Sequence, residues 1–535
     1  MRSLVAGALA VVGGIALGSL GFEGMSAAPG QGNQPSPFVD ASVQSDVSPP
    51  LRHIPPAKHE PKLHEHPWRR PEGAQGGSPD SVIQSAPGAP VNLSTILNFA
   101  GVGNGDYGFV PDAAPPDTNG AVGATQYVQW VNESFAVFNK TTGALVYGPV
   151  PGNTIWSGFG GGCQTNNDGD PIVQYDKQAN RWIFTQFSVS TTPYLQCVAV
   201  STTSDATGPY NRYAFSYSNQ FPDYPKLGVW PDGYYVTYNM FLNGFSFSGP
   251  RVCAWDRQAM LSGAGQVTQV CFQIGNGVHS LLPSDLDGTA APAVGEPNLL
   301  ARINTGTAVQ VWQFHVDFVT PSNSTLTGPT SLAVASFTRA CGGGTCVPQP
   351  GTSQQLDSLA DRAMYRFAYR HFGGFESWVL NHSVATSLAR RNKPVGSGIR
   401  WYELRNTGTP GSLPTVFQQS TFAPDSAYRW MGSIAQDKFG DILVGYSVSS
   451  SSVSPAIRVA GRLPGDPLGT LGAESNVQVG GGSQQGFNLE RWGDYSAMSV
   501  DPGDDCTLYY TNEYLKANGA FNWSTRIGKF KFPGC

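Results

Sequence analysis

The sequence predicts an all-β protein, a β-propeller with seven blades, or six if the weakest repeat forms none. Its composition is rich in glycine (65) and proline (41), and only 13% of residues are charged against the usual ~25%, which excludes coiled coils and most helical folds. Hydrophobic residues at 40% provide enough apolar surface to exclude wholesale disorder. A phrase that recurs seven times between residues 100 and 535 then indicates a repeat architecture.

Residues 1–28 are typical of a secretory signal peptide. Arg2 precedes an apolar run from Leu4 to Leu20, and small residues follow at Ala27 and Ala28, where we expect cleavage. An uncleaved membrane anchor is the alternative, because the run approaches the ~18 residues of a membrane span, but its glycines weaken such a helix. We therefore expect a secreted, extracellular protein with no membrane span after signal cleavage.

Residues 29–90 are predicted to be a disordered, proline-rich linker, and residues 91–535 the propeller domain. The linker has little of the alternating apolar pattern that would let it bury surface. It also holds four of the eight histidines, namely His53, His59, His64 and His66. These could bind metal, but a plain polar linker is the preferred interpretation because a flexible chain fixes no coordinating geometry.

Eight cysteines, an even number, indicate disulfide bonds in a secreted chain. Eight cysteines allow 105 pairings, so the sequence leaves the connectivity open. Pairing of sequence neighbours would close four local loops, 163–197, 253–271, 341–346 and 506–535. No CxxC or HExxH motif occurs, so neither a zinc ribbon nor a zincin is indicated, and no metal site is predicted.

Each copy of the recurring phrase has the pattern of a β-hairpin. "GDPIVQYDKQANRWIFTQF" and "YRWMGSIAQDKFGDILVGYS" both alternate apolar and polar residues on either side of an Asp-containing turn. Further strand-like segments follow most copies, so four short strands per repeat are expected, as in a propeller blade. The copies begin with a charged residue: Asp117, Asp170, Asp223, Asp287, Asp361, Arg429 and Asp494. Strand-like segments at 94–101 and 525–532 flank the repeats and are expected to pair and close the ring.

If each copy opens the innermost strand of a blade, its leading charged residue faces the mouth of the central channel. Carboxylates, guanidinium groups and aromatic faces that converge on such a mouth suit sugar recognition and acid–base chemistry. Two carboxylates on opposite sides of a sugar suit glycoside hydrolysis. The predicted catalytic residues are Asp170, Asp361 and Asp494, and the predicted substrate-binding residues are Asp117, Asp223, Arg362, Arg429, Trp430, Arg491 and Trp492. The alternative is structural, since repeated aspartates also bind backbone amides between blades.

No cofactor is predicted, and calcium is kept as an alternative. "NNDGDP" (166–171) and "SDLDG" (284–288) cluster oxygen ligands on loops, but neither completes the spacing of an EF-hand, and Asp-Gly pairs more often form turns. The net charge of −5 gives no basic surface, so nucleic acid is excluded as a partner. The absence of GxSxG and GxxxxGK[ST] excludes a nucleophile elbow and a phosphate-binding loop.

The phrases "PPDTNGAVGATQYVQWVN", "GDPIVQYDKQANRWIFTQF" and "RWGDYSAMSVDPGDDCTLYYTNEY" resemble those of large secreted bacterial β-propeller proteins, most of which have no defined activity. The resemblance covers residues 95 to 535. More loosely, the chain is similar to sialidase-like propellers, but it lacks a good S-x-D-x-G-x-T-W box and a FRIP-type opening. No catalytic residue is therefore carried over from sialidases, since fold alone does not give function.

Two functions remain open from the sequence. The first is a secreted carbohydrate-active enzyme, a glycoside hydrolase in kind, with carboxylates at the central funnel as acid and base. The second is a non-catalytic surface propeller that binds a glycan or a protein. The expected partner is an extracellular glycan or a cell-surface ligand, and a monomer is expected because a closed propeller needs no partner subunit.

Overall fold

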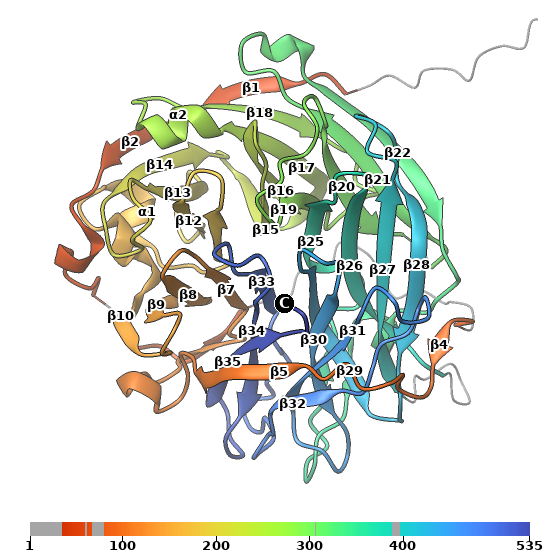
Figure 1. Cartoon of the computed structure of the whole chain (residues 1–535). Helices are drawn as coiled ribbons and strands as arrows, with labels where there is room; N and C mark the ends of the chain where they lie inside the picture. The colour runs from red at the N-terminus through yellow and green to blue at the C-terminus, as the bar shows by residue number, and fades with distance from the viewer. Residues whose placement is uncertain (1–34, 59–60, 67–79, 305, 388–395) are drawn as a thin grey trace, which may run out of the picture. The chain divides into compact units, whose positions relative to one another are not determined.

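The computed structural model describes residues 35–58, 61–66, 80–304, 306–387 and 396–535, so the predicted signal peptide lies outside the described residues. The described chain is almost entirely β-structure (Figure 1). Its helices are short: α1 (Gly161–Thr165), α2 (Arg257–Ser262) and the 3-10 turns η1 (Leu51–His53), η2 (Asp106–Gly108), η3 (Gly152–Trp156), η4 (Pro321–Asn323) and η5 (Ala340–Gly343). Among the described residues, no helix has the length and apolar character needed to cross a membrane.

Most strands form antiparallel groups of four that follow one another along the chain. The first groups are β7 (Thr118–Val122), β8 (Gln126–Val131), β9 (Ser134–Asn139), β10 (Leu145–Pro151); β11 (Ile172–Asp176), β12 (Arg181–Ser188), β13 (Leu195–Ser201), β14 (Tyr210–Ser216); and β15 (Gln220–Val229), β16 (Gly233–Leu242), β17 (Ser246–Asp256), β18 (Thr268–Gln273). Within each group every strand pairs with the next one in the chain.

The later groups follow the same order. They are β19 (Leu282–Leu286), β20 (Asn298–Ile303), β21 (Ala308–His315), β22 (Thr325–Ala333); β25 (Met364–His371), β26 (Glu376–Ala385), β27 (Ser397–Asn406), β28 (Thr415–Phe422); and β29 (Tyr428–Gln436), β30 (Ile442–Ser449), β31 (Ala456–Arg462), β32 (Ser475–Gln478). Parallel pairings of β19 with β25 and of β27 with β29 join these groups into one thirteen-stranded sheet. The small pair β23 (Thr345–Val347) and β24 (Leu356–Asp357) lies between β22 and β25 in the chain.

The first strand of each group lines the centre of the molecule, and these strands contact each other in sequence order. Strand β7 contacts β11, β11 contacts β15, β15 contacts β19, and the series continues through β25, β29 and β33 (Ala497–Val500). Strand β33 in turn contacts β7, which closes a ring of sheets around a centre (Figure 1). The predicted all-β propeller fold is therefore confirmed.

Aspartates in the middle of the repeated phrase form the hairpin turns. The Asp176 carboxylate accepts hydrogen bonds from the backbone amides of Gln178 (3.1 Å) and Ala179 (2.9 Å), between β11 and β12. Asp437 does the same for Phe439 (2.9 Å) and Asp441 (3.0 Å) between β29 and β30. These are Asx-type turns, which explains why the sequence pattern marked them as hairpins.

The hydrophobic core lies between neighbouring sheets of the ring. Trp130 of β8 meets Phe184 of β12 edge-to-face, with ring centroids 5.5 Å apart. Phe215 of β14 stacks on Trp255 of β17 at 5.3 Å. Each sheet thus buries both faces against its neighbours, which is why strands such as β13 and β30 are apolar or buried along their whole length.

The ring is closed by a sheet built from both ends of the repeat region. Strand β5 (Ser94–Ala100) pairs antiparallel with β35 (Trp523–Lys531), which pairs with β34 (Leu508–Leu515) and then β33. The prediction that residues 94–101 and 525–532 join is confirmed. The two ends of the repeat region are thus held in one sheet, with β5 as its outer strand.

The four disulfides join sequence neighbours, as one of the open pairings proposed. They are Cys163–Cys197, Cys253–Cys271, Cys341–Cys346 and Cys506–Cys535. The second links paired residues of β17 and β18. Each bond closes a loop within or next to one group of strands, so the disulfides secure individual sheets.

The prediction that residues 29–90 form a disordered linker is wrong for the described part of that segment. Strands β1 (Phe38–Ala41) and β2 (Gln44–Val47) pair with the outer edges of β18 and β14, and β4 (Ile83–Gln84) pairs with β28. Strand β3 (His64–Glu65) pairs with β6 (Ala113–Ala114). The segment needs no core of its own because the outermost strands of the ring supply unpaired backbone groups that it satisfies.

Candidate functional site

The innermost strands all run in the same direction, so their first residues meet on one face of the ring, which we call the front face. Two of the aspartates that lead the repeats, Asp117 and Asp170, join neighbouring sheets on this face, whereas Asp287 follows β19 and does not lie at its start. The Asp117 carboxylate accepts a hydrogen bond from the backbone amide of Asp494 (2.7 Å), and Asp170 accepts one from the amide of Tyr224 (3.1 Å). Each contact links two neighbouring sheets. The structure therefore brings Asp117, Asp170 and Asp494 together, and gives the first two a structural role.

The carboxylates of the front face lie close enough for their charges to affect one another. Burial, helped by the nearby charge of Asp170, raises the pKa of Asp117 to about 7. Arg491 pairs with Asp494 and also with the buried Asp357 of β24, where its Nε lies 2.9 Å from Oδ2. Asp170 and Asp494 keep some exposed surface, whereas Asp117 is 2% exposed.

A fully buried lysine, Lys226, lies among these carboxylates. The Lys226 ammonium lies 3.6 Å from the ring centroid of Tyr224 and 4.1 Å from that of Tyr495, and it donates to the Pro225 carbonyl (2.8 Å). Burial lowers its pKa to about 7, against the opposing charge of Asp170. Sequence reasoning missed Lys226 because no motif surrounds it, and only its place three residues after Asp223 in the repeat could have drawn attention to it.

Asp361 and Arg362 form a fully buried ion pair. Arg362 donates through Nε to Asp361 Oδ1 (2.9 Å) and through Nη2 to Oδ2 (3.0 Å), and its guanidinium covers the Tyr224 ring at 4.4 Å. Burial opposes ionisation of Asp361, but the Arg362 charge outweighs it and lowers the pKa of Asp361 to about 2. With 1% of its surface exposed, Asp361 lies out of reach of a substrate.

The remaining predicted residues lie in three different places. Arg429 binds Asp425 and Glu474, each at 2.8 Å, within its own group of strands. Trp430 and Trp492 are fully buried, with ring centroids 5.9 Å apart, and belong to the core. Asp223 is half-buried near the start of β15, on the front face.

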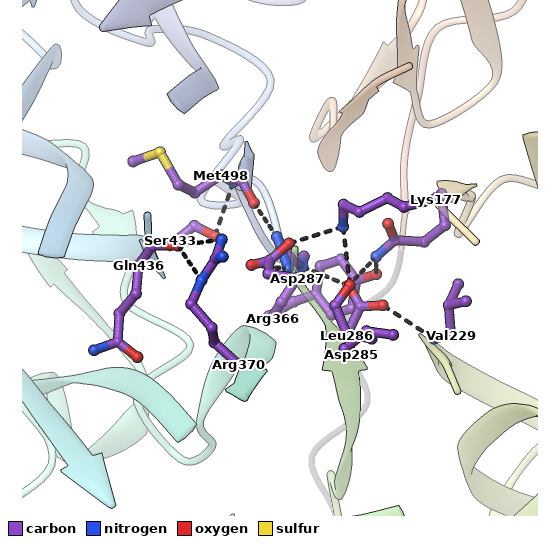
Figure 2. Close-up of polar contacts among 12 residues, drawn as sticks. Lys177, Val229, Asp285, Leu286, Asp287, Arg366, Arg370, Ser433, Gln436 and Met498 are labelled. Atoms are coloured by element: carbon purple, nitrogen blue, oxygen red, sulfur yellow. Dashed lines mark hydrogen bonds and ion pairs between the residues drawn. The ribbon is translucent and has the colours of Figure 1, made fainter. Parts of the chain in front are cut away.

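An ion-pair network joins side chains of the innermost strands β19 and β25 and the turn after β11 (Figure 2). Arg366 of β25 binds Asp285 Oδ2 and Asp287 Oδ2, both at 2.6 Å, and donates to the Met498 carbonyl (2.7 Å). Lys177 adds a bond to Asp287 Oδ1 at 2.8 Å. The carboxylates of "SDLDG", considered above as calcium ligands, are thus taken up by cationic side chains from neighbouring sheets.

An open pocket of about 320 Å³ lies on the front face beside the channel mouth. Its outer side is aromatic, formed by Phe187 of β12, Tyr194, Phe221 of β15 and the 88% exposed Phe245. Loops of three successive groups of strands contribute to it. Its inner side is polar and is formed by His64, His66, Glu133 and Asp168.

Two histidines of the N-terminal segment point at one carboxylate in this pocket. Nε2 of His64 lies 2.8 Å and Nε2 of His66 3.1 Å from the same oxygen, Oε1 of Glu133. The hydrogen bond to Glu133, against the effect of burial, raises the pKa of His64 to about 9. Burial opposes ionisation of Glu133, but both imidazoles outweigh it and lower its pKa to about 2.

The prediction that these histidines belong to a flexible polar linker is wrong for His64 and His66. His64 and His66 are held by the pairing of β3 with β6, where the amides of His64 and His66 donate to the carbonyls of Asp112 (3.0 Å) and Ala114 (2.7 Å). His53 lies exposed in η1, and His59 lies outside the described residues. No sequence signal links His64 to Glu133, because they are distant in the chain and only the fold brings them together.

No established sequence family matches the chain, and no curated protein does. Solved structures that resemble it include a polysaccharide lyase (12% identity, TM-score 0.37, 78% of this chain and 90% of that one). A Hadza microbial sialidase (11%, 0.32, 77% and 74%) and the WD40 domain of SCAP from fission yeast (8%, 0.31, 76% and 81%) also resemble it. Likeness this remote says nothing of substrate, and the fold rests on the strand pairings above.

Proposed function

We propose that this chain is a secreted, carbohydrate-active β-propeller, a glycoside hydrolase in kind, whose substrate lies in the front-face pocket. The observation that carries the proposal is the composition of that pocket. One wall is made of the aromatic rings of Phe187, Tyr194 and Phe221, and the other holds Glu133 and Asp168. Apolar faces with a few convergent polar groups are what a sugar ring, with its apolar faces and polar edge, requires.

We propose seven blades. Each antiparallel group of four strands would be one blade. The thirteen-stranded sheet would be three of them with β4 added, and β5, β33, β34 and β35 would form the closing blade. The circuit of contacts between first strands supports this count, because each group contributes one strand to it.

Among the predicted catalytic carboxylates, the proposal retains Asp170 and Asp494. Both keep exposed surface on the front face, next to the channel mouth. Asp361 is no longer proposed as catalytic, because it is buried in an ion pair with Arg362. Asp170 also lies near the pocket, because a side chain on its neighbour Gly169 would come within 3.7 Å of the His66 ring.

Export and a monomeric state belong to the same proposal. Four disulfides are typical of proteins that fold in an oxidising compartment. They support the signal peptide predicted for residues 1–28. The ring of sheets is closed by its own strands, which supports a monomer.

A non-catalytic binding propeller is the second candidate. It is favoured by the use of Asp117 and Asp170 as acceptors for backbone amides of neighbouring sheets. Carboxylates committed to such bonds serve the fold, which leaves the aromatic wall as a recognition surface for a glycan.

The test is a glycan-array and polysaccharide-depolymerisation screen. The protein should begin at residue 29, because residues 38–47 complete two sheets. New reducing ends without unsaturated sugars would support hydrolysis. New unsaturated ends would show that the reaction is that of a lyase and not of a hydrolase. Binding without cleavage would favour the second candidate. Neither binding nor cleavage would contradict both.

Variants locate the site. Phe221→Ala and Tyr194→Ala should each weaken glycan binding or turnover at least tenfold if the pocket holds the substrate. Phe439→Ala is the matched control, because Phe439 is an exposed aromatic in the turn after β29, at the end of an innermost strand and not on the front face. Asp170→Asn and Asp494→Asn should abolish turnover while the fold survives. Equal turnover in those two variants would remove them from the mechanism.

A further inference from the structure

We propose that His64, His66 and Glu133 bind one divalent transition-metal ion of the zinc type, with an open coordination position toward the front-face pocket. The ligand atoms, an imidazole nitrogen from each histidine and a carboxylate oxygen, all lie within 4.8 Å of one another. The proposal is independent of whether the chain acts on carbohydrate. It concerns residues that no motif in the sequence marks as metal ligands.

The three side chains converge on one point. Both Nε2 atoms approach the same oxygen of Glu133, at 2.8 and 3.1 Å. Zinc bonds of about 2.0–2.2 Å in tetrahedral geometry would hold neighbouring ligand atoms about 3.3 Å apart. The two nitrogen–oxygen distances are therefore within a few tenths of an ångström of those that a bound ion would impose, and the two nitrogens lie within 4.8 Å of each other.

The hydrogen bonding of His64 leaves Nε2 as the nitrogen available to a metal ion. Its Nδ1 lies 2.7 Å from the Lys62 carbonyl oxygen, which can only accept, so Nδ1 carries a hydrogen. Nε2 faces the Glu133 carboxylate at 2.8 Å, and a metal ion would take the place of the proton between these two atoms. A backbone carbonyl on the far ring nitrogen is also the usual support of a metal-bound histidine.

Hydrogen bonds fix the backbone of all three ligand residues. His64 and His66 belong to the β3–β6 pairing, and the Glu133 carbonyl accepts bonds from the Gly152 amide (2.7 Å) and from Asn167 Nδ2 (2.9 Å). The site thus spans the N-terminal segment and the β8–β9 turn. Ligands held this way keep the positions that a metal requires.

The donor set selects the type of ion. Two imidazoles and one carboxylate suit zinc and its neighbours in the first transition series, whereas calcium takes six to eight oxygen ligands. Three protein ligands leave a fourth position for water or an oxygen of a bound molecule, as in zinc sites that are open to substrate. That position faces a pocket whose far wall includes Phe187, Tyr194 and Phe221. The ligand expected there carries a hydroxyl or carboxylate oxygen beside an apolar face.

Metal stoichiometry and cobalt spectroscopy test the proposal on the full chain without its predicted signal peptide. After treatment with EDTA and dialysis against zinc, elemental analysis should find one zinc per chain. Cobalt should give the strong visible bands of a four-coordinate site. His64→Ala, His66→Ala and Glu133→Gln should each weaken zinc binding at least 100-fold. His53→Ala, an exposed histidine of the same segment, should leave binding unchanged.

Three results would overturn the proposal: less than a tenth of an equivalent of zinc on the unaltered chain, unchanged affinity in the three variants, or an equal loss in His53→Ala. Glu133→Gln keeps the size of the side chain and separates loss of a ligand from loss of folding. Its thermal unfolding without metal should remain cooperative, at a temperature lowered only by the loss of its ion pairs with the two histidines. Zinc binding is measured without glycan, so failure of the carbohydrate screen leaves this result intact.

Discussion

The Asp117 carboxylate accepts a hydrogen bond from the backbone amide of Asp494 at 2.7 Å, across 377 residues of chain. The bond joins the first and the last of the repeated phrases, on the face where the innermost strands begin. Asp170 makes the equivalent bond to Tyr224 between the second and third. A residue type that the sequence suggested for catalysis therefore fastens one sheet of the propeller to the next.

Loss of the Asp117 carboxylate should destabilise the fold. Asp117→Ala is expected to cost about 1–3 kcal/mol, because it leaves the partly buried Asp494 amide without its acceptor. Asp117→Asn keeps an acceptor oxygen and should cost less. Denaturant titration measures both, with the exposed Asp40→Ala as control. An Asn variant as unstable as the Ala variant would mean that charge, and not the hydrogen bond, matters here.

The buried pair of Asp361 and Arg362 should make stability depend on pH. Asp361→Asn is expected to cost about 3–5 kcal/mol at pH 7, since Arg362 keeps an uncompensated buried charge. The pKa of Asp361 is lowered from 3.8 to about 2 in the folded chain, so its contribution is complete above pH 4 and is lost as the pH falls toward 2. The difference between the two proteins in denaturant titration should shrink over that range. A constant difference from pH 7 to 2 would contradict the assignment.

The N-terminal segment should be part of the stable fold. Deletion of residues 29–50 removes β1 and β2 and takes Asp46 from the buried Arg212, to which it is bound at 2.5 and 2.7 Å. The melting temperature should fall by several degrees and the exposed edges of β14 and β18 should promote aggregation. Calorimetry and light scattering measure these effects. Deletion of residues 29–34 alone is the control, and equal behaviour of the two deletions would show that the strands add nothing.

The four disulfides should contribute different amounts to the free energy of unfolding. Loop-closure entropy assigns about 3.5 kcal/mol to Cys506–Cys535, which are 29 residues apart, and about 2 kcal/mol to Cys341–Cys346, which are 5 apart. Paired Cys→Ser substitutions followed by denaturant titration give both numbers. The reverse order would indicate that the short loop carries structure that the entropy account leaves out.

Local patterns predicted much of the fold from the sequence. The alternation around Asp176 and Asp437 marks hairpins because the same aspartates bind the turn amides. The closing strands could also be predicted, since strand alternation is a local property. The even number of cysteines indicated disulfides but left their pairing open. Strands β1 and β2 were not. An edge strand outside the core is mostly exposed and shows no apolar face, so its pairing with β18 and β14 leaves no mark in its residues.

The candidate site could be predicted only in part. The repeat placed Asp117, Asp170 and Asp494 together on one face, because equivalent positions of repeated sheets are related by rotation about the ring axis. It could not show that the carboxylates of Asp117 and Asp170 are used by neighbouring amides. It also could not join His64 to Glu133, because that contact depends on the path of the N-terminal segment, which no periodicity encodes.

The pairing of β5 with β35 means that the ring can close only at the end of folding. A ribosome produces residues 94–100 more than four hundred positions before residues 523–531, yet these segments are neighbours in one sheet. A chain that lacks the later segment can form only an open ring of sheets. Such a ring has two unpaired edges. Because the contact is so distant in sequence, final closure must wait until synthesis of both segments is complete. Helper proteins that shield exposed strands would therefore matter most in that interval.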